Sequence, residues 1–132
     1  MFKAIIILSI IMSCNQLPCK IGKSEIVEAL SILFSKGILE LPDNELNISV
    51  PSGYENYLAR KVKIRDKTIK LYSDKPVIPA VRFIAIKSEE EGLIKIYFSA
   101  SEAGYKYKGE ILFKCINDRL IYNNIHYISE IS

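Results

Sequence analysis

The feature that most constrains the fold is a succession of segments, from about residue 57 to the end of the chain, in which apolar and polar residues alternate. The clearest examples are Ile94, Ile96 and Phe98 in one segment and Ile111, Phe113 and Cys115 in another. Alternation with a period of two is typical of a strand that buries one face against a core. The sequence therefore predicts a sheet with one buried face, and Cys115 is expected to face the core.

Short turns join these segments into three hairpins. The segment "YLARKVKIR" leads through Asp66-Lys67 into "TIKLYS", and "AVRFIAIK" is joined to "LIKIYFSA" by the acidic turn "SEEEG", residues 88–92. The last hairpin joins "KYKGEILFKCI" to "RLIYNNIHYISEI" through Asn117-Asp118. Polar residues between two strand-like segments favour tight antiparallel connections.

A single helix is expected before the strands. Ser24 is a suitable N-cap, apolar residues then recur at the spacing of one helical face, and Gly37 is placed to end the helix. These signals predict a helix over residues 24–36 that covers one face of a sheet. Residues 40–56 contain two prolines and several Asn and Asp residues, so we expect mostly loop there, with a short edge strand at residues 46–50.

One helix followed by antiparallel strands predicts the α+β class, with the N-terminal helix packed on a curved antiparallel β-meander. Residues 80–131, which end in "DRLIYNNIHYISEI", resemble the cystatin-like or nuclear-transport-factor-2-like (NTF2-like) arrangement. In those families, long strands curl around an N-terminal helix. The resemblance rests on the pattern of strands, and it assigns a function to no residue.

The first residues are typical of a targeting segment. Lys3 precedes a short apolar run over residues 4–12, whereas a membrane-spanning helix needs about 20 apolar residues. The run has the length of the apolar region of a secretory signal peptide, about 7–15 residues. The alternative is an apolar first strand with Cys14 buried in the core.

The four residues Ile11-Met12-Ser13-Cys14 resemble the lipobox of bacterial lipoproteins. The resemblance implies that the chain is cut before Cys14 and that lipid is attached to its thiol, with Asn15 favouring the outer membrane if the organism has one. The expected organisation is a signal peptide over residues 1–13, a tether over residues 14–23 and a single domain over residues 24–132.

The cysteine count fits an exported protein. With Cys14 committed to lipid, Cys19 and Cys115 remain as an even pair in a compartment that permits disulfides. The alternative is a buried thiol at Cys115 and a free thiol at Cys19. The chain has one His, and no Cys or His spacing resembles a metal site, so we expect no metal and no cofactor.

The charge balance is mild. Loss of Lys3 with the signal peptide leaves 17 of the 18 basic residues against 15 acidic ones. Nucleic-acid-binding domains are usually strongly basic, with clustered Lys and Arg. We identify no such cluster in the sequence and expect no nucleic-acid partner.

Three groups of residues are candidates for chemistry or binding. His126 could act as a general base beside a carboxylate, although a lone His on a strand is more often a packing or surface residue. The acidic turn at residues 88–92 could bind a cation, although like charges at a hairpin tip are usually just solvated. Tyr105 and Tyr107 alternate with Lys106 and Lys108, which places rings on one strand face and ammonium groups on the other. Tyrosines favour interfaces, so these four residues are the expected interface, while an ordinary half-buried strand has the same pattern.

The expected function is that of a non-enzymatic cell-envelope lipoprotein, anchored to the membrane at Cys14, whose domain binds a protein or a ligand. Immunity proteins and protease inhibitors are examples of such small exported domains. One alternative is a small NTF2-like enzyme with His126 and a carboxylate in a pocket between helix and sheet. Another is a structural part of an envelope complex.

Overall fold

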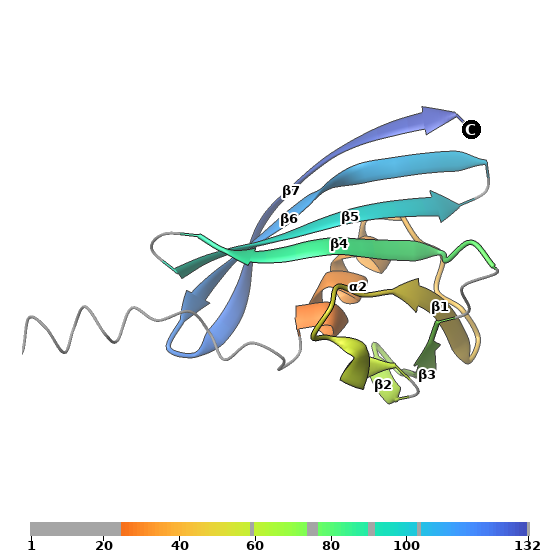
Figure 1. The fold of residues 1–132 in the computed structure, drawn as a ribbon, viewed down its shortest axis with the longest axis horizontal. Coiled ribbons are helices and arrows are strands. Elements are labelled where there is room, and N and C mark those ends of the chain that lie inside the picture. The colour runs from red at the N-terminus through yellow and green to blue at the C-terminus, as the bar shows by residue number, and fades with distance from the viewer. Residues whose placement is uncertain (1–24, 59, 74–76, 90–91, 103, 132) are drawn as a thin grey trace, which may run out of the picture.

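The computed structural model describes residues 25–58, 60–73, 77–89, 92–102 and 104–131. Within them the chain forms an α-helix, a short 3₁₀ helix and seven strands (Figure 1). The helices are α2 (Glu25–Ser35) and η1 (Glu55–Tyr57). The strands are β1 (Glu45–Ser49), β2 (Lys61–Ile64), β3 (Lys67–Tyr72), β4 (Val81–Ser88), β5 (Leu93–Glu102), β6 (Tyr105–Ile116) and β7 (Arg119–Ile131).

Helix α2 confirms the expected helix, and its end has a local cause. Gly37 has φ +74°, a left-handed conformation that residues with a Cβ adopt at a cost. The Ile38 N–H donates to the Leu33 carbonyl at 3.0 Å, and the Gly37 N–H donates to the Phe34 carbonyl at 3.2 Å. This pair of hydrogen bonds is the Schellman motif, which satisfies the last carbonyls of a helix. The chain is thereby turned from the helix toward β1.

The expected class, a helix packed on an antiparallel meander, is wrong. The seven strands form one mixed sheet in the order β2-β3-β1-β4-β5-β6-β7, and this sheet curls strongly into a half-barrel (Figure 1). Strand β1 lies parallel to both of its neighbours, β3 and β4, whereas the other pairs are antiparallel. A meander has only neighbours in sequence side by side, so the insertion of β1 between β3 and β4 excludes it.

Strand β1 is also not the edge strand that the sequence suggested. Leu46, Asn47 and Ile48 are all buried, which is a continuous pattern rather than an alternating one. A strand enclosed by parallel neighbours is covered on both faces and shows this continuous burial. The loop character of the flanking residues concealed a strand at the centre of the sheet.

The three hairpins are confirmed. In the first, Ile64 pairs with Lys67, so the turn consists of Arg65 and Asp66, one residue earlier than expected. In the last, Asn117 and Asp118 have φ of 52° and 61°. Positive φ at both central positions is the requirement of a type I′ turn, which suits Asn and Asp and matches the twist of the strands.

Irregularities in β4 and β7 accompany the curl of the sheet. The register between β4 and β5 shifts between Phe83 and Ala85, and the register between β6 and β7 shifts between Leu112 and Phe113. Such bulges increase the local twist and bend the strand that carries the extra residue. In β4 the extra residue is Ile84, which is exposed.

The hollow side of the half-barrel holds the core. The buried face of α2 packs there with alternate residues of the strands, and Cys115 is half-buried against the same cluster, as expected. The largest fully buried side chains in this core include Phe83, Phe98, Phe113, Ile26, Leu30 and Leu33. The space between helix and sheet is therefore filled by side chains.

Candidate interaction surface

Strand β7 is one edge of the sheet in the strand order. It is the longest strand, with 13 residues, and among the described residues it pairs only with β6. Natural edge strands are commonly short or protected by Lys or Pro, because their unpaired backbone groups can bind another strand. Strand β7 contains neither Lys nor Pro. Apart from the bulge opposite Leu112 and Phe113, it is therefore a long edge with little protection against pairing.

Exposed apolar side chains follow this edge. Ile128 is 62% exposed and Ile131 is 84% exposed, and Ile121 and Tyr127 are also largely accessible. Scattered exposed apolar residues are normal, but a row of them on one strand is a feature of interaction surfaces. Within the described residues, strand β7 thus has one side that pairs with no strand, and it exposes apolar side chains on both of its faces. The Ile125 N–H donates to the side-chain oxygen of Asn124 at 2.9 Å.

The predicted alternation of tyrosines and lysines places three aromatic rings together. The Tyr105 and Tyr107 ring centroids are 6.3 Å apart, and the Tyr107 ring meets Tyr127 edge to face at 6.1 Å. Tyr107 also packs against the core, whereas Tyr105 and Tyr127 are exposed. We call Tyr105, Tyr107 and Tyr127 the tyrosine cluster. The sequence proposed two of its members, and the third comes from the neighbouring strand because Gly109 pairs with Tyr127.

Lys106 and Lys108 occupy the alternate positions of β6 and are exposed. Lys106 lies opposite Glu130 and Lys108 lies opposite Ile128 in the β6–β7 register. These lysines therefore lie on the face of the sheet that is turned away from the tyrosine cluster. Their part in an interface remains a prediction.

Gly109 permits an unusually close approach of the two strands. A Cβ at this position would collide with the backbone oxygen of His126 and would lie 2.7 Å from the Cβ of Tyr127. Only a residue without a side chain fits this contact. The close approach brings Tyr127 against β6, next to Tyr107.

An open hollow of about 720 Å³ lies over the same strands. Its apolar lining includes Ile84, Tyr97 and Ile128, and Glu110 and His126 form part of its rim. Glu110 and His126 are directly opposite in the register, but the ring Nε2 of His126 contacts the amide Nδ2 of Asn124 at 3.2 Å. The alternative function, a small enzyme, requires a carboxylate hydrogen-bonded to the imidazole ring of His126 in a pocket between helix and sheet. The described residues show a packed core there and no carboxylate bonded to His126.

The other predicted sites are described only in part. Glu90 and Glu91 of the acidic turn lie outside the described residues, and within them no three His, Cys, Asp or Glu side chains are grouped to hold a metal ion. Cys14 and Cys19 also lie outside the described residues, as do residues 1–24 as a whole. Cys115 is disulfide-bonded in the structure. The pairing of Cys19 with Cys115 and the lipid on Cys14 remain predictions.

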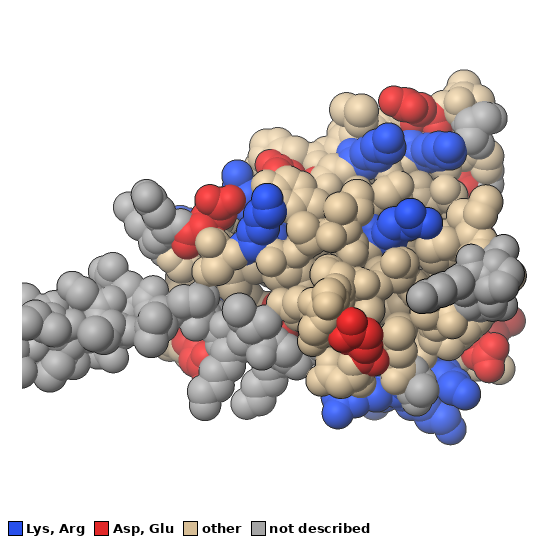
Figure 2. Space-filling model, viewed as in Figure 1, with Lys and Arg blue, Asp and Glu red and all other residues tan. Residues whose placement is uncertain are grey.

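The sequence analysis missed a basic surface at the opposite edge of the sheet. We call residues 60–70, which include β2 and the first four residues of β3, the basic hairpin. Figure 2 shows blue side chains gathered at the lower edge of the molecule, where β2 and β3 lie in Figure 1. The expectation that Lys and Arg are not clustered is wrong for this segment. The signal was present in "RKVKIRDKTIK", which has six basic residues and one acidic residue. The small net charge of the whole chain concealed it.

Comparisons with known proteins give no family for this chain. No protein-family model matches it, and no curated protein sequence or solved structure is significantly similar to it. Among the described residues, no helix has the length and apolarity needed to cross a membrane.

Proposed function

We propose that this protein is a lipid-anchored component of the bacterial cell envelope that binds another protein through strand β7 and the tyrosine cluster. The observation that carries the proposal is the 13-residue edge strand that lacks Lys and Pro and exposes Ile128 and Ile131. The mode of binding is strand addition, in which an extended segment of the partner pairs with the outer edge of β7.

The tyrosine cluster supports this mode. Strand addition supplies affinity through backbone hydrogen bonds, and side chains next to the edge supply specificity. Tyrosine is enriched at protein interfaces because it buries a large ring and keeps a hydroxyl for hydrogen bonding. Tyr105 and Tyr127 are both exposed, so the partner's side chains can pack on their rings.

The cellular address in this proposal is supported by the sequence alone. Lys3, the apolar run over residues 4–12 and the lipobox-like residues 11–14 are the signals of an exported, acylated protein. Several acyl chains hold a protein to a membrane far more firmly than one chain does. The anchor at Cys14 would keep the binding domain near the membrane surface.

The test is crosslinking in intact cells followed by detergent extraction and mass spectrometry. A photoreactive residue replaces Tyr105, and the tagged protein is compared with a double variant, Ile128→Lys with Ile131→Lys. The matched control is Val77→Lys, because Val77 is an exposed apolar residue outside the sheet. Lysines on an edge strand oppose pairing with another strand.

We expect the parent protein and the Val77→Lys control to capture the same specific protein, and the double variant to lose it. Capture that persists in the double variant would contradict the role of β7. A separate variant, Cys14→Ala, tests the proposed membrane attachment. It should remove the mass of the acyl chains from the mature protein and release the protein from the membrane fraction. Retention in the membrane with no change in mass would contradict acylation.

A further inference from the structure

We propose that the basic hairpin binds the anionic headgroups of the membrane surface and so provides a second attachment beside the lipid on Cys14. This inference rests on the proposed function, because it takes the domain to be held near a membrane. The partner it names is a phospholipid surface with net negative charge.

The charges of the chain are segregated. Residues 60–70 have a formal charge of +5, from six basic residues and one acidic residue, whereas the whole chain has +3. All other residues together therefore carry −2. The expected tether over residues 14–23 adds Lys20 and Lys23 and contains no acidic residue. Positive charge is thus concentrated in the tether and the basic hairpin.

The hairpin brings like charges directly together. Lys61 lies opposite Lys70 in the β2–β3 register, and Lys63 is the diagonal neighbour of Lys70 on the same face. All three side chains are exposed. Like charges directly opposite each other in a sheet are destabilising. Glu45 of β1 lies opposite Lys70 and lines the same hollow as Lys61 and Lys70. Among the described residues, no acid lies opposite Lys61 or Lys63 in the register.

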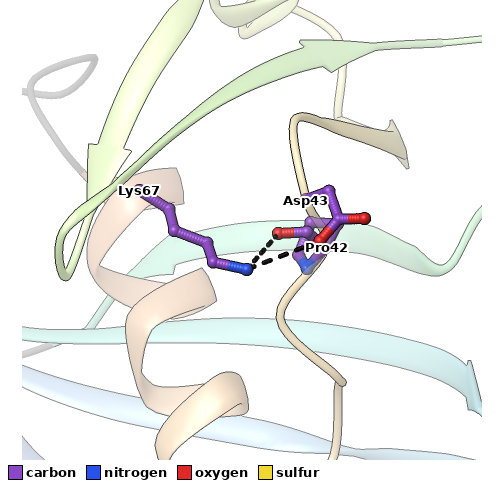
Figure 3. A network of polar contacts seen from close by, with 3 residues as sticks. All are labelled: Pro42, Asp43 and Lys67. Carbon is purple, nitrogen blue, oxygen red and sulfur yellow. Dashed lines mark hydrogen bonds and ion pairs between the residues drawn. The ribbon is translucent and has the colours of Figure 1, made fainter.

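One lysine of the segment has a different role. The ammonium group of Lys67 lies 3.5 Å from the Pro42 carbonyl oxygen and 3.7 Å from a carboxylate oxygen of Asp43 (Figure 3). The Lys67 backbone pairs with Ile64, on the side of the hairpin that faces the core. Lys67 therefore ties the hairpin to the loop before β1, and the exposed lysines of the opposite face are left for a partner.

A membrane fits this surface better than a nucleic acid does. Proteins that bind single-stranded nucleic acid add aromatic rings on which bases stack. The exposed side chains on the outer face of the hairpin strands are lysines and Thr68, and the one aromatic residue of β2 and β3, Tyr72, is half-buried. Lipid headgroups require only charge, and each Lys or Arg near an anionic surface raises affinity roughly fivefold. Because Glu25 lies 11 positions after Cys14 in the chain, a tether of at most about 40 Å keeps the hairpin within reach of the bilayer.

The arrangement also fits the proposed binding edge. Strands β2 and β7 are the two edges of the sheet in the strand order, and Figure 1 places them on opposite sides of the molecule. A domain that rests on the membrane through the basic hairpin therefore presents β7 and the tyrosine cluster away from the bilayer.

The experiment is lysine footprinting of the acylated full protein on vesicles. The protein is reconstituted on phosphatidylcholine vesicles and on vesicles of equal parts phosphatidylcholine and phosphatidylglycerol, then labelled with an amine reagent that does not cross membranes. Mass spectrometry compares Lys61, Lys63 and Lys70 with exposed lysines elsewhere. A triple variant, Lys61→Gln, Lys63→Gln and Lys70→Gln, is matched by Lys87→Gln, Lys106→Gln and Lys114→Gln, which removes the same charge from β4 and β6.

We expect labelling of the three hairpin lysines to fall at least about threefold on anionic vesicles relative to neutral ones, and to recover when salt screens the attraction. When both variants also carry Cys14→Ala and so lack the lipid, the hairpin variant should float with anionic vesicles less than the control variant does. The control variant should also keep the protection of Lys61, Lys63 and Lys70. Equal labelling on the two kinds of vesicle, or an equal fall at all lysines, would overturn the inference. So would protection by single-stranded DNA but not by anionic vesicles.

Different results would contradict the lipid anchor at Cys14 and membrane binding by the basic hairpin. Flotation of the protein with neutral vesicles depends on the lipid anchor and not on the hairpin. If the protein did not float with neutral vesicles, acylation at Cys14 would be contradicted. The ratio of lysine labelling between anionic and neutral vesicles would still test membrane binding by the basic hairpin.

Discussion

Replacement of Gly109 by alanine should have two opposing effects on the free energy of unfolding. The backbone of Gly109 is not in the left-handed region, so alanine is conformationally allowed and should stabilise the protein by about 0.4–1 kcal/mol through the unfolded state. Against this, the added methyl group would collide with the His126 carbonyl oxygen and lie 2.7 Å and 2.8 Å from the Cβ and Cα of Tyr127. Favourable contacts between carbon atoms lie at about 3.5–4.0 Å.

The steric effect should dominate. The atoms in the way belong to the backbone and to a Cβ, so no flexible side chain can move aside, and β7 itself has to recede. Overpacking of this kind costs about 1–3 kcal/mol. We expect Gly109→Ala to lower the free energy of unfolding by about 1–2 kcal/mol after the entropic gain.

Urea unfolding followed by circular dichroism measures this change. With a slope of about 2 kcal/mol per molar urea, the middle of the usual range, the midpoint should fall by roughly 0.5–1 M. Lys108→Ala is the control, since this neighbouring side chain is exposed and its loss should change stability by no more than about 0.5 kcal/mol. A Gly109→Ala variant that is as stable as the parent, or more stable, would refute the close approach of β6 and β7.

Three further substitutions test the fold. Lys61→Glu should raise the free energy of unfolding by about 0.2–1 kcal/mol, because it places opposite charges across from each other at Lys70, and the gain should shrink at high salt in urea titrations. Lys106→Glu should instead lower the free energy of unfolding in the same assay, because Lys106 lies opposite Glu130. A change of the same sign for both substitutions would contradict the two strand registers. Cys115→Ser should cost about 2–4 kcal/mol under oxidising conditions by removing the disulfide, and an unchanged urea midpoint would argue against that bond.

The elements that the sequence predicted well are those with local causes. Helix α2 begins and ends within a residue or two of the expected positions because a stripe of apolar residues and the left-handed Gly37 act within a few residues. The hairpins were predicted because alternation and turn residues such as Asn117 and Asp118 are likewise local. In the first and last hairpins, the turn positions agree with the structure to within one residue.

The order of the strands depended on contacts that are distant in sequence. Strand β1 carries Pro and Asn on its flanks and has only five residues, so nothing local distinguishes a central parallel strand from an edge strand. Its place between β3 and β4 follows from the burial of Leu46 and Ile48 in the shared core. This single insertion changed the class from a meander to a mixed sheet.

In the candidate surfaces, too, the sequence predicted the local features and not those that depend on the pairing of strands. The sequence predicted that Tyr105 and Tyr107 share a face, because that follows from the period of a strand. It did not predict that Tyr127 joins them, because this depends on the register of β7 against β6. The basic hairpin was readable in the sequence and was missed because charge was averaged over the whole chain.

The sequence by itself determined the local elements of this protein, and it alone carries the prediction of a lipid anchor at Cys14. Spacing, turn chemistry and short motifs are properties of neighbouring residues, so they can be recognised without a fold. Only the tertiary structure decided which strands become edges, and therefore that β7 and the basic hairpin lie at opposite limits of the sheet. The reason is that the order of the strands depends on the burial of a common core. This burial involves all strands at once, so it cannot be recognised in the sequence of any single strand.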